Sequence, residues 1–315
     1  MVKGKKIAVV VPAYNEEKLI GKVIETMPEF VDFIIVVDDG STDGTSNVVK
    51  KYQDQNKREI ILLRHATNRG VGGAIISGHK KALEVGADVV AVMAGDAQMD
   101  PSDLPNILEP VINGQCDYSK GNRFINGEAW RKMPRLRFFA NAVLSMLNKI
   151  TSGFWHISDP QCGYTAISST ALRKLNLDAI SQGYHFENSM LTELNIHNMK
   201  VTDVPIKAIY GIGEKSGINE FVAIFSFTLF LVKAFVQRLY RKYIIRDFHP
   251  LVFFYFFGLL SLLAGLGFGL YLIAIRLIMG TIVEATSALF AMLLFLSGLQ
   301  MVLFGMWFDK DYSSR

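Results

Sequence analysis

Residues 33–45 read FIIVVDDGSTDGT, in which an apolar, largely β-branched run passes directly into two aspartates, a glycine and a serine. A short run of this composition, bounded by turn residues, predicts a buried β-strand that ends at Val37. Runs of the same kind occur at residues 7–11, 60–63 and 88–94. Polar or glycine-rich residues follow each run, so every predicted strand ends in a polar cluster.

Helical patterns separate these strands. Apolar residues with helical spacing occupy residues 16–27, 42–52 and 74–85. Alternating strands and helices predict a parallel sheet with right-handed crossovers. In such sheets ligands bind at the carboxyl ends of the strands, where the polar clusters lie. Beyond residue 105 the pattern is looser, with strands expected at 116–123, 163–168 and 200–210 and helices at 136–150 and 187–195.

Two long apolar segments distinguish the C-terminal part of the chain. Residues 248–275 and 285–308 contain no Asp, Glu, Lys or Arg, whereas residues 1–218 have the mixed composition of a globular domain. Each segment exceeds the ~20 residues that a helix needs to cross the hydrocarbon core. Because the connection between them is short, they predict a transmembrane hairpin whose ends lie on one side. The alternative is a pair of helices buried in a soluble core.

Basic residues precede the first apolar segment. Under the positive-inside rule they place this side of the membrane, and with it the preceding domain, in the cytoplasm. Residues 219–247 predict an amphipathic helix in the membrane interface, with its basic side chains toward anionic headgroups. The alternative is a further membrane span, in which Lys233 would be costly. The basic residues concerned are Lys233, Arg238, Arg241, Lys242 and Arg246.

The composition argues against several classes of protein. The net charge is only +4, and no Lys/Arg-rich surface with interspersed aromatic residues stands out. We therefore expect no nucleic-acid partner. The two cysteines, Cys116 and Cys162, form neither a disulfide framework nor a metal-ligand spacing.

The cluster after the first strand has side chains suited to a nucleoside. In VPAYNEE, residues 11–17, Tyr14 can contact a base or ribose and Glu16 can accept hydrogen bonds. The alternative is a simple strand-to-helix turn, with Asn15 as the helix N-cap.

The next two clusters add acids and glycines. Asp38 and Asp39 can bind base N–H groups and ribose hydroxyls, and a capped turn alone does not explain two adjacent acids. The glycine-rich turn at residues 68–73 allows the backbone to come close to a ligand.

Taken together, the clusters resemble a known family. The strings VPAYNEE, VVDDGSTDGT, NRGVGGA and GDAQMDP, in this order, resemble the nucleotide-sugar domain of glycosyltransferase family 2 over residues 5–218. The resemblance implies an α/β fold of the GT-A (Rossmann-like) type. With the basic segment and the hairpin added, the chain resembles the polyprenyl-phosphate glycosyltransferases of that family, which include dolichyl-phosphate mannose synthases.

The expected organisation follows from these observations. It comprises an integral membrane protein with a cytoplasmic GT-A domain at 1–218 and a juxtamembrane helix at 219–247. A transmembrane hairpin at 248–308 and a cytoplasmic tail at 309–315 complete it.

The resemblance implies a metal site after the fourth strand. The family has Asp-x-Asp at this point, whereas this chain has Ala94 and Asp96. Asp96 and the amide oxygen of Gln98, together with donor phosphate oxygens, would hold Mg²⁺ or Mn²⁺. The alternative for Asp96 is a helix N-cap at a strand end.

Other residues are assigned to the donor and the reacting centre by the same resemblance. Arg123 and Lys215 would meet the donor phosphates, although Lys215 could instead lie in an exposed linker. Asp96 and Asp159 are the expected catalytic residues, and Asp159 would orient the acceptor or sugar or act as a base. The expected nucleotide-sugar-binding residues are Pro12, Tyr14, Glu16, Asp38, Asp39, Asn68, Gly70, Asp96, Ala97, Arg123 and Lys215.

The acceptor phosphate would bind near the helix that begins after residue 133. Arg131, Arg137 and Asn141 are the residues implied by the resemblance. The alternative is a basic helix start that faces solvent or lipid.

The implied reaction is an inverting transfer of a hexose, mannose or glucose, from GDP-mannose or UDP-glucose to polyprenyl or dolichyl phosphate on the cytoplasmic face. Because a phosphate acceptor is already ionised, the enzyme needs cations more than it needs a strong base. One alternative is a family-2 enzyme with a glycolipid or polysaccharide acceptor, although the Gln-x-x-Arg-Trp element of processive polymerases is absent. Another is a non-catalytic nucleotide-sugar-binding membrane scaffold, which the loss of an acid at Ala94 would favour.

Overall fold

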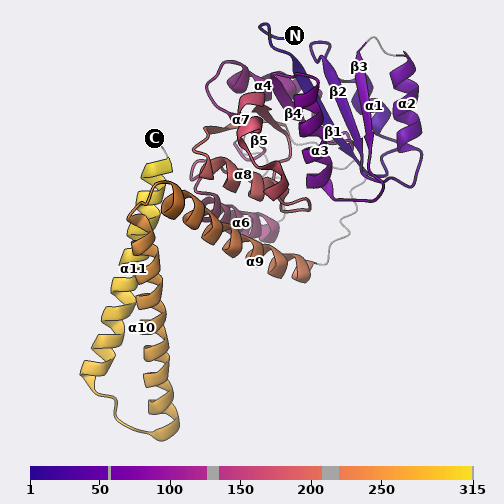
Figure 1. Cartoon of the computed structure of the whole chain (residues 1–315). Helices are drawn as coiled ribbons and strands as arrows, with labels where there is room; N and C mark the ends of the chain where they lie inside the picture. The colour runs from indigo at the N-terminus through magenta and orange to yellow at the C-terminus, as the bar shows by residue number, and fades with distance from the viewer. Residues whose placement is uncertain (56–57, 126–134, 208–219, 314–315) are drawn as a thin grey trace. The chain divides into compact units, whose positions relative to one another are not determined.

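A computed structural model describes residues 1–55, 58–125, 135–207 and 220–313 (Figure 1). The chain divides into two compact units, Met1–Phe235 and Val236–Arg315. The division lies inside the segment 219–247, for which the sequence predicts a single juxtamembrane helix.

The first four strands form a parallel half-sheet, as predicted. In the order β3-β2-β1-β4 they pair in parallel, with Val9 beside Ile34 on one side and Ala91 on the other. Short β-branched runs form strands here because both faces of the sheet are covered. The strands are β1 (Ile7–Ala13), β2 (Phe33–Asp38), β3 (Glu59–Arg64) and β4 (Val89–Val92).

The second half of the sheet is mixed in direction. β6 (Thr165–Ser168) runs antiparallel to both β4 and β5 (Tyr118–Asn122), and β7 (Val201–Pro205) is parallel to β5. Within the described residues this completes a seven-stranded sheet in the order β3-β2-β1-β4-β6-β5-β7. The sequence predicted these strands but not the antiparallel insertion of β6, because an apolar run carries no information about strand direction.

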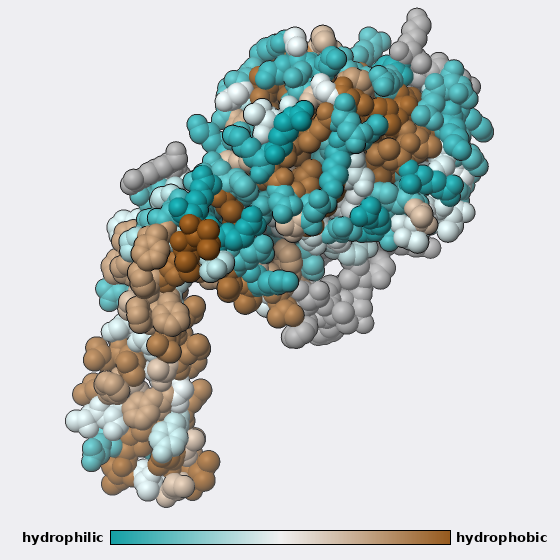
Figure 2. Space-filling model, in the orientation of Figure 1, coloured by the Kyte–Doolittle hydropathy of each residue, from teal (hydrophilic) through white to brown (hydrophobic). Residues whose placement is uncertain are grey.

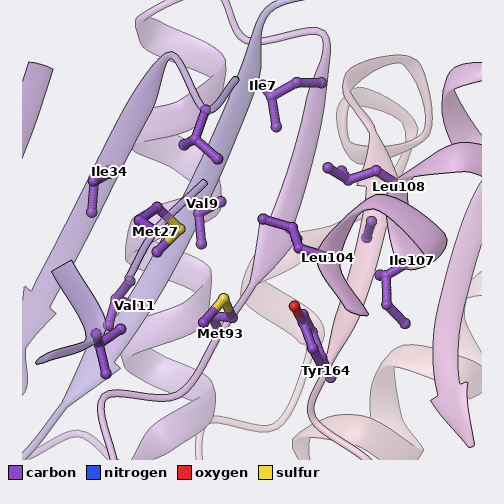
Figure 3. Close-up of a cluster of buried hydrophobic side chains, with 14 of the residues drawn as sticks. Ile7, Val9, Val11, Met27, Ile34, Met93, Leu104, Ile107, Leu108 and Tyr164 are labelled. Atoms are coloured by element: carbon purple, nitrogen blue, oxygen red, sulfur yellow. The ribbon is translucent and has the colours of Figure 1, made fainter. Parts of the chain in front are cut away.

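The core consists of two layers, one on each face of the sheet. Ile7, Val9 and Val11 point to one face, and Ala8 and Val10 to the other. Figure 3 shows the first of these layers, which includes Met27 and the helical residue Leu104. The helices on that face are α1 (Ile20–Glu25), α2 (Thr45–Gln55) and α4 (Leu104–Ile112). Those on the other face are α3 (Val71–Glu84), α7 (Ser169–Lys174) and α8 (Phe186–Ile196).

Helix α4 was not predicted. Prolines at 105 and 110 break its sequence pattern, yet Pro105 occupies the first turn, where a proline needs no N–H partner. Five buried residues, including Ile107 and Leu108, tie α4 to the sheet. Each buried side chain of this size contributes about 1.5–3 kcal/mol, which outweighs the weak local preference.

The second unit contains the predicted hairpin. Helices α10 (Leu251–Met279) and α11 (Ala285–Ser313) have mean hydropathies of 2.2 and 2.1 over their most apolar windows. Only 22% and 17% of those windows are buried, so these are not helices of a soluble core. Figure 2 shows hydrophobic side chains on the surface of the hairpin. By length and composition both helices could cross a membrane.

The segment before the hairpin begins with α9 (Glu220–Arg238) and continues as the π-helix η3 (Leu239–Arg246). Within the described residues, only α10 and α11 are long and apolar enough to be candidate spans. The alternative of a further span in this segment therefore finds no support.

Glycines set the close contact of the two hairpin helices. A Cβ atom added at Gly265 would lie 2.4 Å from the backbone nitrogen of Phe295. One added at Gly298 would lie 2.3 Å from the backbone nitrogen of Leu262. Small residues at such contacts let membrane helices pack backbone against backbone.

A buried ion pair connects the end of α9 to the last turns of α11. Both terminal nitrogens of Arg238 donate to the carboxylate of Asp309, each at 2.8 Å, and both side chains are fully buried. The hydroxyl of Tyr243 donates to the same carboxylate. Helix α11 thus continues to Ser313, through residues for which the sequence predicts a tail.

Candidate active site

A pocket of about 240 Å³ lies at the carboxyl ends of β1 and β2. Five of the residues predicted to bind the nucleotide sugar line it, drawn from three separate clusters of the sequence. Their convergence agrees with the rule that ligands collect at this edge of a parallel sheet. These residues are Pro12, Tyr14, Asp39, Asn68 and Gly70, and the wall also includes Ala13, Val71, Ala74, Gly183 and Tyr184.

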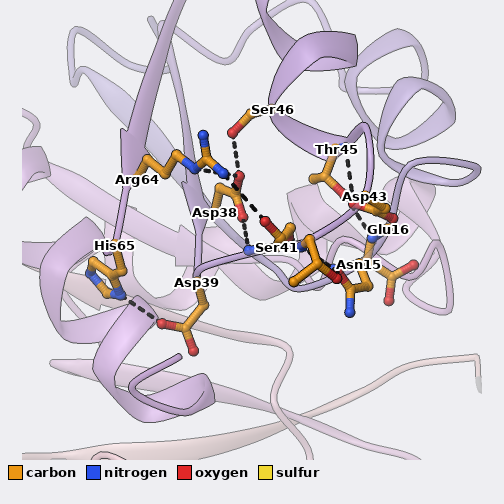
Figure 4. A network of polar contacts seen from close by, with 11 residues as sticks. Asn15, Glu16, Asp38, Asp39, Ser41, Asp43, Thr45, Ser46, Arg64 and His65 are labelled. Atoms are coloured by element: carbon orange, nitrogen blue, oxygen red, sulfur yellow. Dashed lines mark hydrogen bonds and ion pairs between the residues drawn. The ribbon is translucent and has the colours of Figure 1, made fainter. Parts of the chain in front are cut away.

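The two adjacent aspartates have different surroundings (Figure 4). Asp38 is fully buried, and its carboxylate accepts hydrogen bonds from the backbone nitrogen of Ser41, at 2.8 Å, and from the hydroxyl of Ser46. Asp39 lines the pocket. The geometry therefore gives Asp38 an internal role in holding the turn after β2, while Asp39 faces the ligand space.

The carboxylate of Asp39 is oriented by two contacts to one oxygen. Its Oδ1 accepts from the backbone nitrogen of Arg69, at 2.9 Å, and lies 2.6 Å from Nδ1 of His65. The other ring nitrogen of His65 is 2.9 Å from the hydroxyl oxygen of Ser77. Within the described residues no hydrogen bond engages Oδ2 of Asp39, which leaves that oxygen for a base or ribose. His65 was not predicted as a site residue, because a lone histidine after a strand carries no pattern.

The turn after β1 is joined to the turn after β2. The amide of Asn15 donates to Ser41 Oγ, and the amide of Thr42 donates to Asn15 Oδ1, each at 2.9 Å. The alternative in which Asn15 caps a helix is wrong, because the residue before α1 is Leu19 and it makes no side-chain cap. These contacts fix the position of Tyr14 at the pocket.

The glycine-rich turn before α3 makes room for another part of the same protein. The amide of Gly73 donates to the carbonyl of Gln182 at 2.9 Å. A Cβ atom at Gly70 would lie 2.7 Å from that carbonyl oxygen, and one at Gly72 would lie 2.5 Å from the carbonyl oxygen of Ser181. The close approach that the sequence predicted for a ligand is thus made by residues 181–183, which also bring Tyr184 to the pocket.

The segment after β4 carries the expected metal ligand. The carboxylate of Asp96 accepts from the amide of Gln98 at 3.0 Å, and the amide of Gly95 donates to the carbonyl of Pro12 at 3.1 Å. The alternative of a helix N-cap at Asp96 is wrong, because Asp100 caps the following 3-10 helix, Pro101–Asp103. Asp96 therefore lies beside the strand end that lines the pocket.

Negative charge accumulates at this end of the sheet. Burial raises the pKa of Glu16, and the carboxylates of Asp96 and Asp43 raise it further. Within the described residues, no group of three or more His, Cys, Asp or Glu side chains could hold a metal ion. The acidic environment suits a cation, but a divalent ion at Asp96 would need further oxygen ligands, such as a diphosphate.

The end of β5 carries a bidentate ion pair. Nε and one terminal nitrogen of Arg123 donate to the two carboxylate oxygens of Asp159, at 2.7 and 2.9 Å. Asp159 is buried, whereas the side chain of Arg123 is 32% exposed. The structure thus brings two predicted site residues together, with Asp159 behind Arg123.

A buried lysine anchors the loop that carries Asp159. Lys120 is fully buried in β5, and its ammonium group donates to the carbonyl of Cys162. Burial raises the pKa of Glu187 on α8, although the charges of Lys120 and Arg123 oppose this shift. Lys120 was not predicted as a site residue, because a lysine in a strand is ordinarily solvent-facing.

The side chains of four predicted site residues lie outside the described part of the chain. Arg131 and Lys215 lie outside the described residues. Arg137 and Asn141 belong to helix α6 (Arg135–Ser152), and their side chains are outside the described part. Their roles at the phosphates remain predictions.

Comparisons with known proteins give a consistent picture. Residues 8–175 match the model of the family described as Glycosyl transferase family 2. The UDP-N-acetylglucosamine–dolichyl-phosphate N-acetylglucosaminyltransferase of Methanococcus voltae is 34% identical over 218 residues, or 65% of this chain and 86% of the relative. The undecaprenyl-phosphate mannosyltransferase of Micrococcus luteus is 32% identical over 209 residues, or 64% of this chain and 82% of the relative.

Solved structures show the same fold. Glucosyl-3-phosphoglycerate synthase from Mycobacterium tuberculosis, in complex with Mn²⁺, UDP and phosphoglyceric acid, has a TM-score of 0.54 at 20% identity. The match covers 75% of this chain and 78% of that one. The same synthase has also been solved with Mg²⁺ and UDP, with a TM-score of 0.51 at 19% identity and coverage of 75% and 79%. At this identity the likeness concerns the fold.

Proposed function

Since this chain belongs to glycosyl transferase family 2 and has the GT-A fold, we propose that it transfers a hexose from a nucleotide-activated sugar to polyprenyl or dolichyl phosphate. The chain is a glycosyltransferase, and relatives named for transfer to polyprenyl phosphates support this class of acceptor. GDP-mannose and UDP-glucose are the donors that we favour.

The pocket at the ends of β1 and β2 would receive the nucleoside part of the donor. The unengaged oxygen of Asp39 would accept a hydrogen bond from the base or ribose, and Tyr14 offers an aromatic face beside it. Both base types present N–H groups, so these contacts do not choose between GDP and UDP.

In the proposed step, a phosphate oxygen of the acceptor attacks the anomeric carbon of the sugar. A new carbon–oxygen bond forms as the bond to the nucleoside diphosphate breaks, and the anomeric configuration inverts. The acceptor oxygen is already ionised at neutral pH, so no proton has to be removed.

The Arg123–Asp159 ion pair is the main observation in favour of a phosphate acceptor. A general base must be free to accept a proton from an alcohol. Asp159 is buried, and both of its oxygens accept hydrogen bonds from the guanidinium of Arg123. Such a carboxylate is suited to orienting a cation, and Arg123, whose side chain is 32% exposed, is suited to binding a phosphate. An acceptor that needs no base fits this arrangement.

Asp96 and the side chain of Gln98 would hold Mg²⁺ or Mn²⁺ together with the donor diphosphate. The acidic surroundings of Asp96 and Glu16 favour a cation, and the lack of a third described acidic, histidine or cysteine ligand favours binding that depends on the donor. When bound, such an ion stabilises the nucleoside-diphosphate leaving group. Lys215, Arg131, Arg137 and Asn141 are the further residues that we assign to the phosphates.

We place the catalytic domain on the cytoplasmic side of the membrane. The basic residues before α10 support this orientation under the positive-inside rule. Leu229, Val232 and Val236 form an exposed apolar stripe on α9, at the spacing of one helix face. A helix with such a stripe is suited to the membrane interface.

The test is a transfer assay on the full-length chain in detergent or lipid vesicles. Radiolabelled GDP-mannose, UDP-glucose and UDP-N-acetylglucosamine are offered with dolichyl or undecaprenyl phosphate, in the presence of Mg²⁺ or Mn²⁺. We expect labelled lipid with one of the donors and none when dolichol replaces dolichyl phosphate. The Asp96→Ala variant serves as the inactive control. Label that appears only on a neutral glycolipid would favour the alternative acceptor class, and no transfer to any phosphorylated lipid would refute the proposal.

A further inference from the structure

We propose that Tyr184 is a donor-binding residue, and that helix α9 positions it through a ring stack between His185 and Phe230. This inference rests on the proposed function, because it assigns the pocket to the nucleoside of the donor. It adds a residue to the donor site and connects that site to the helix that leads into the hairpin.

Two exposed tyrosines line the pocket. Tyr14 comes from the turn after β1 and is 47% exposed, and Tyr184 comes from the loop before α8 and is 71% exposed. Both line the same cavity of about 240 Å³. A nucleobase is the part of the donor with a flat apolar face, and this face can stack on an aromatic ring.

The backbone before Tyr184 is held on one side by the glycine-rich turn. Gln182 accepts a hydrogen bond from the amide of Gly73, and Gly70 and Gly72 leave no space for a side chain against residues 181–182. The loop is therefore pressed against the segment that supplies Asn68 and Gly70 to the pocket. This contact fixes where the loop starts, but not the direction in which Tyr184 points.

Helix α9 contacts His185, the residue that follows Tyr184. The ring of His185 stacks on that of Phe230 with centroids 4.6 Å apart and planes 9° apart. It also meets the ring of Phe227 edge-on, with centroids 5.0 Å apart. Burial lowers the pKa of His185, which favours the neutral form of the ring in this stack. Tyr184 thus lies between two fixed points, Gln182 and His185.

Helix α9 therefore has two different faces. Phe227 and Phe230 contact the loop, and Leu231 on the same side of the helix is buried. Leu229 and Val232 are exposed on the other side. A helix that is fixed to a membrane by its outer face would hold the Tyr184 loop by its inner face. Donor affinity should consequently depend on the α9 contact, although α9 contributes no described residue to the pocket wall.

The experiment measures the binding of UDP and GDP to the full-length chain by isothermal titration calorimetry. We expect Tyr184→Ala to weaken the binding of the preferred nucleotide about tenfold and Tyr184→Phe to leave it within about twofold, because the ring supplies the stacking. In the transfer assay Tyr184→Ala should raise the donor KM with little change in kcat. Tyr240→Ala, which removes another exposed tyrosine, is the matched control.

A second pair of variants tests the role of α9. Phe230→Ala should weaken nucleotide binding several-fold, whereas Phe230→Tyr, which keeps a ring for the stack, should not. Leu229→Ala, at the exposed neighbouring position of the same helix, should leave binding unchanged. Circular dichroism confirms that each variant is folded.

The possible outcomes test the role of Tyr184, the role of α9 and the proposed function separately. If Tyr184→Ala binds the nucleotide as tightly as the wild type, the assignment of Tyr184 is wrong while the proposed function stands. If Tyr184→Ala weakens binding and Phe230→Ala does not, the positioning role of α9 is wrong. If the wild type binds neither UDP nor GDP, the proposed function fails and this inference with it.

Discussion

Each of the two units contains a bidentate arginine–aspartate pair, and the two pairs differ in exposure. Arg123 and Asp159 lie at the end of β5, with N–O distances of 2.7 and 2.9 Å. Arg238 and Asp309 lie at the base of the hairpin, with both distances at 2.8 Å. The aspartate is buried in each pair, but Arg123 is 32% exposed whereas Arg238 is fully buried.

This difference in exposure supports the proposed phosphate-binding role of Arg123 and indicates a structural role for Arg238. A partly exposed arginine can be oriented by its carboxylate and still meet a phosphate. A guanidinium that is buried together with its carboxylate can only stabilise the packing around it. The desolvation of such a pair is costly, so its removal as a pair is tolerated far better than the removal of one partner.

Removal of one partner of the hairpin pair should have the largest effect. Asp309→Ala leaves the charge of Arg238 buried and uncompensated, and we expect the free energy of unfolding to fall by about 3–5 kcal/mol. Denaturant titration of the detergent-solubilised chain measures this. The double variant Arg238→Met with Asp309→Leu should recover most of the loss. A single variant within about 1 kcal/mol of the wild type would show that the pair is not a structural element.

The buried side chain of His79 should make the stability of the protein depend on pH. His79 on α3 is fully buried, and within the described residues neither ring nitrogen has a hydrogen-bond partner. Burial lowers its pKa from 6.5 to about 4. The unfolded chain therefore takes up a proton at a higher pH than the folded protein. Stability should be constant above about pH 6.5 with respect to this group and fall by up to roughly 3 kcal/mol as the pH drops to 4.

The measurement is the free energy of unfolding between pH 7 and pH 4. His79→Leu has no group to titrate and should flatten this part of the profile. An unchanged slope in His79→Leu would assign the acid sensitivity to other groups.

Replacement of the exposed arginine should affect activity more than stability. Arg123→Lys keeps the charge but loses the planar fork, and we expect transfer to fall about 100-fold, or about 2.7 kcal/mol in the barrier. Asp159→Asn keeps a partner for Arg123 and should cost only about tenfold. The assay is kcat/KM for the donor as a function of pH. If Asp159→Asn instead removes an ionisation from the profile and costs more than Arg123→Lys, Asp159 is a base.

The helix contact of the hairpin should show the smallest effect. Gly265→Ala places a Cβ atom 2.4 Å from the backbone nitrogen of Phe295, and the resulting overpacking should destabilise the hairpin by about 1–3 kcal/mol. Gly267→Ala is the matched control, because a Cβ atom there meets nothing within 4 Å. Thermal unfolding of the two variants in the same detergent measures the difference. Equal melting temperatures would mean that the close contact carries no specific packing energy.

Local patterns were sufficient for the parallel half-sheet and the hairpin. Strands β1 to β4 are short β-branched runs ended by turn residues, and the hairpin helices are long runs without charge. Both signals depend on which neighbours along the chain are apolar, and burial of those residues drives the formation of the elements. The shared position of Tyr14, Asp39 and Asn68 followed from the same reasoning, because parallel strands end at one edge.

The roles of individual polar residues required the folded chain. Asp38 and Asp39 are adjacent in sequence, yet they have different roles in the fold. Asp38 holds its turn through Ser46, whereas Asp39 lines the pocket and contacts His65, and only the folded chain shows this difference. The approach of residues 181–183 to the glycine-rich turn, which brings Tyr184 to the pocket, has no counterpart in any local pattern.

The sequence alone determined the class of fold, the apolar two-helix hairpin and the cluster of polar residues at the sheet edge, because hydrophobic periodicity and turn chemistry act between near neighbours. Only the tertiary structure decided the partners of each charge. Arg123 and Asp159 are 36 residues apart, and Arg238 and Asp309 are 71 apart. Whether such a pair forms, and whether water can reach it, depends on the packing of whole helices and strands around it.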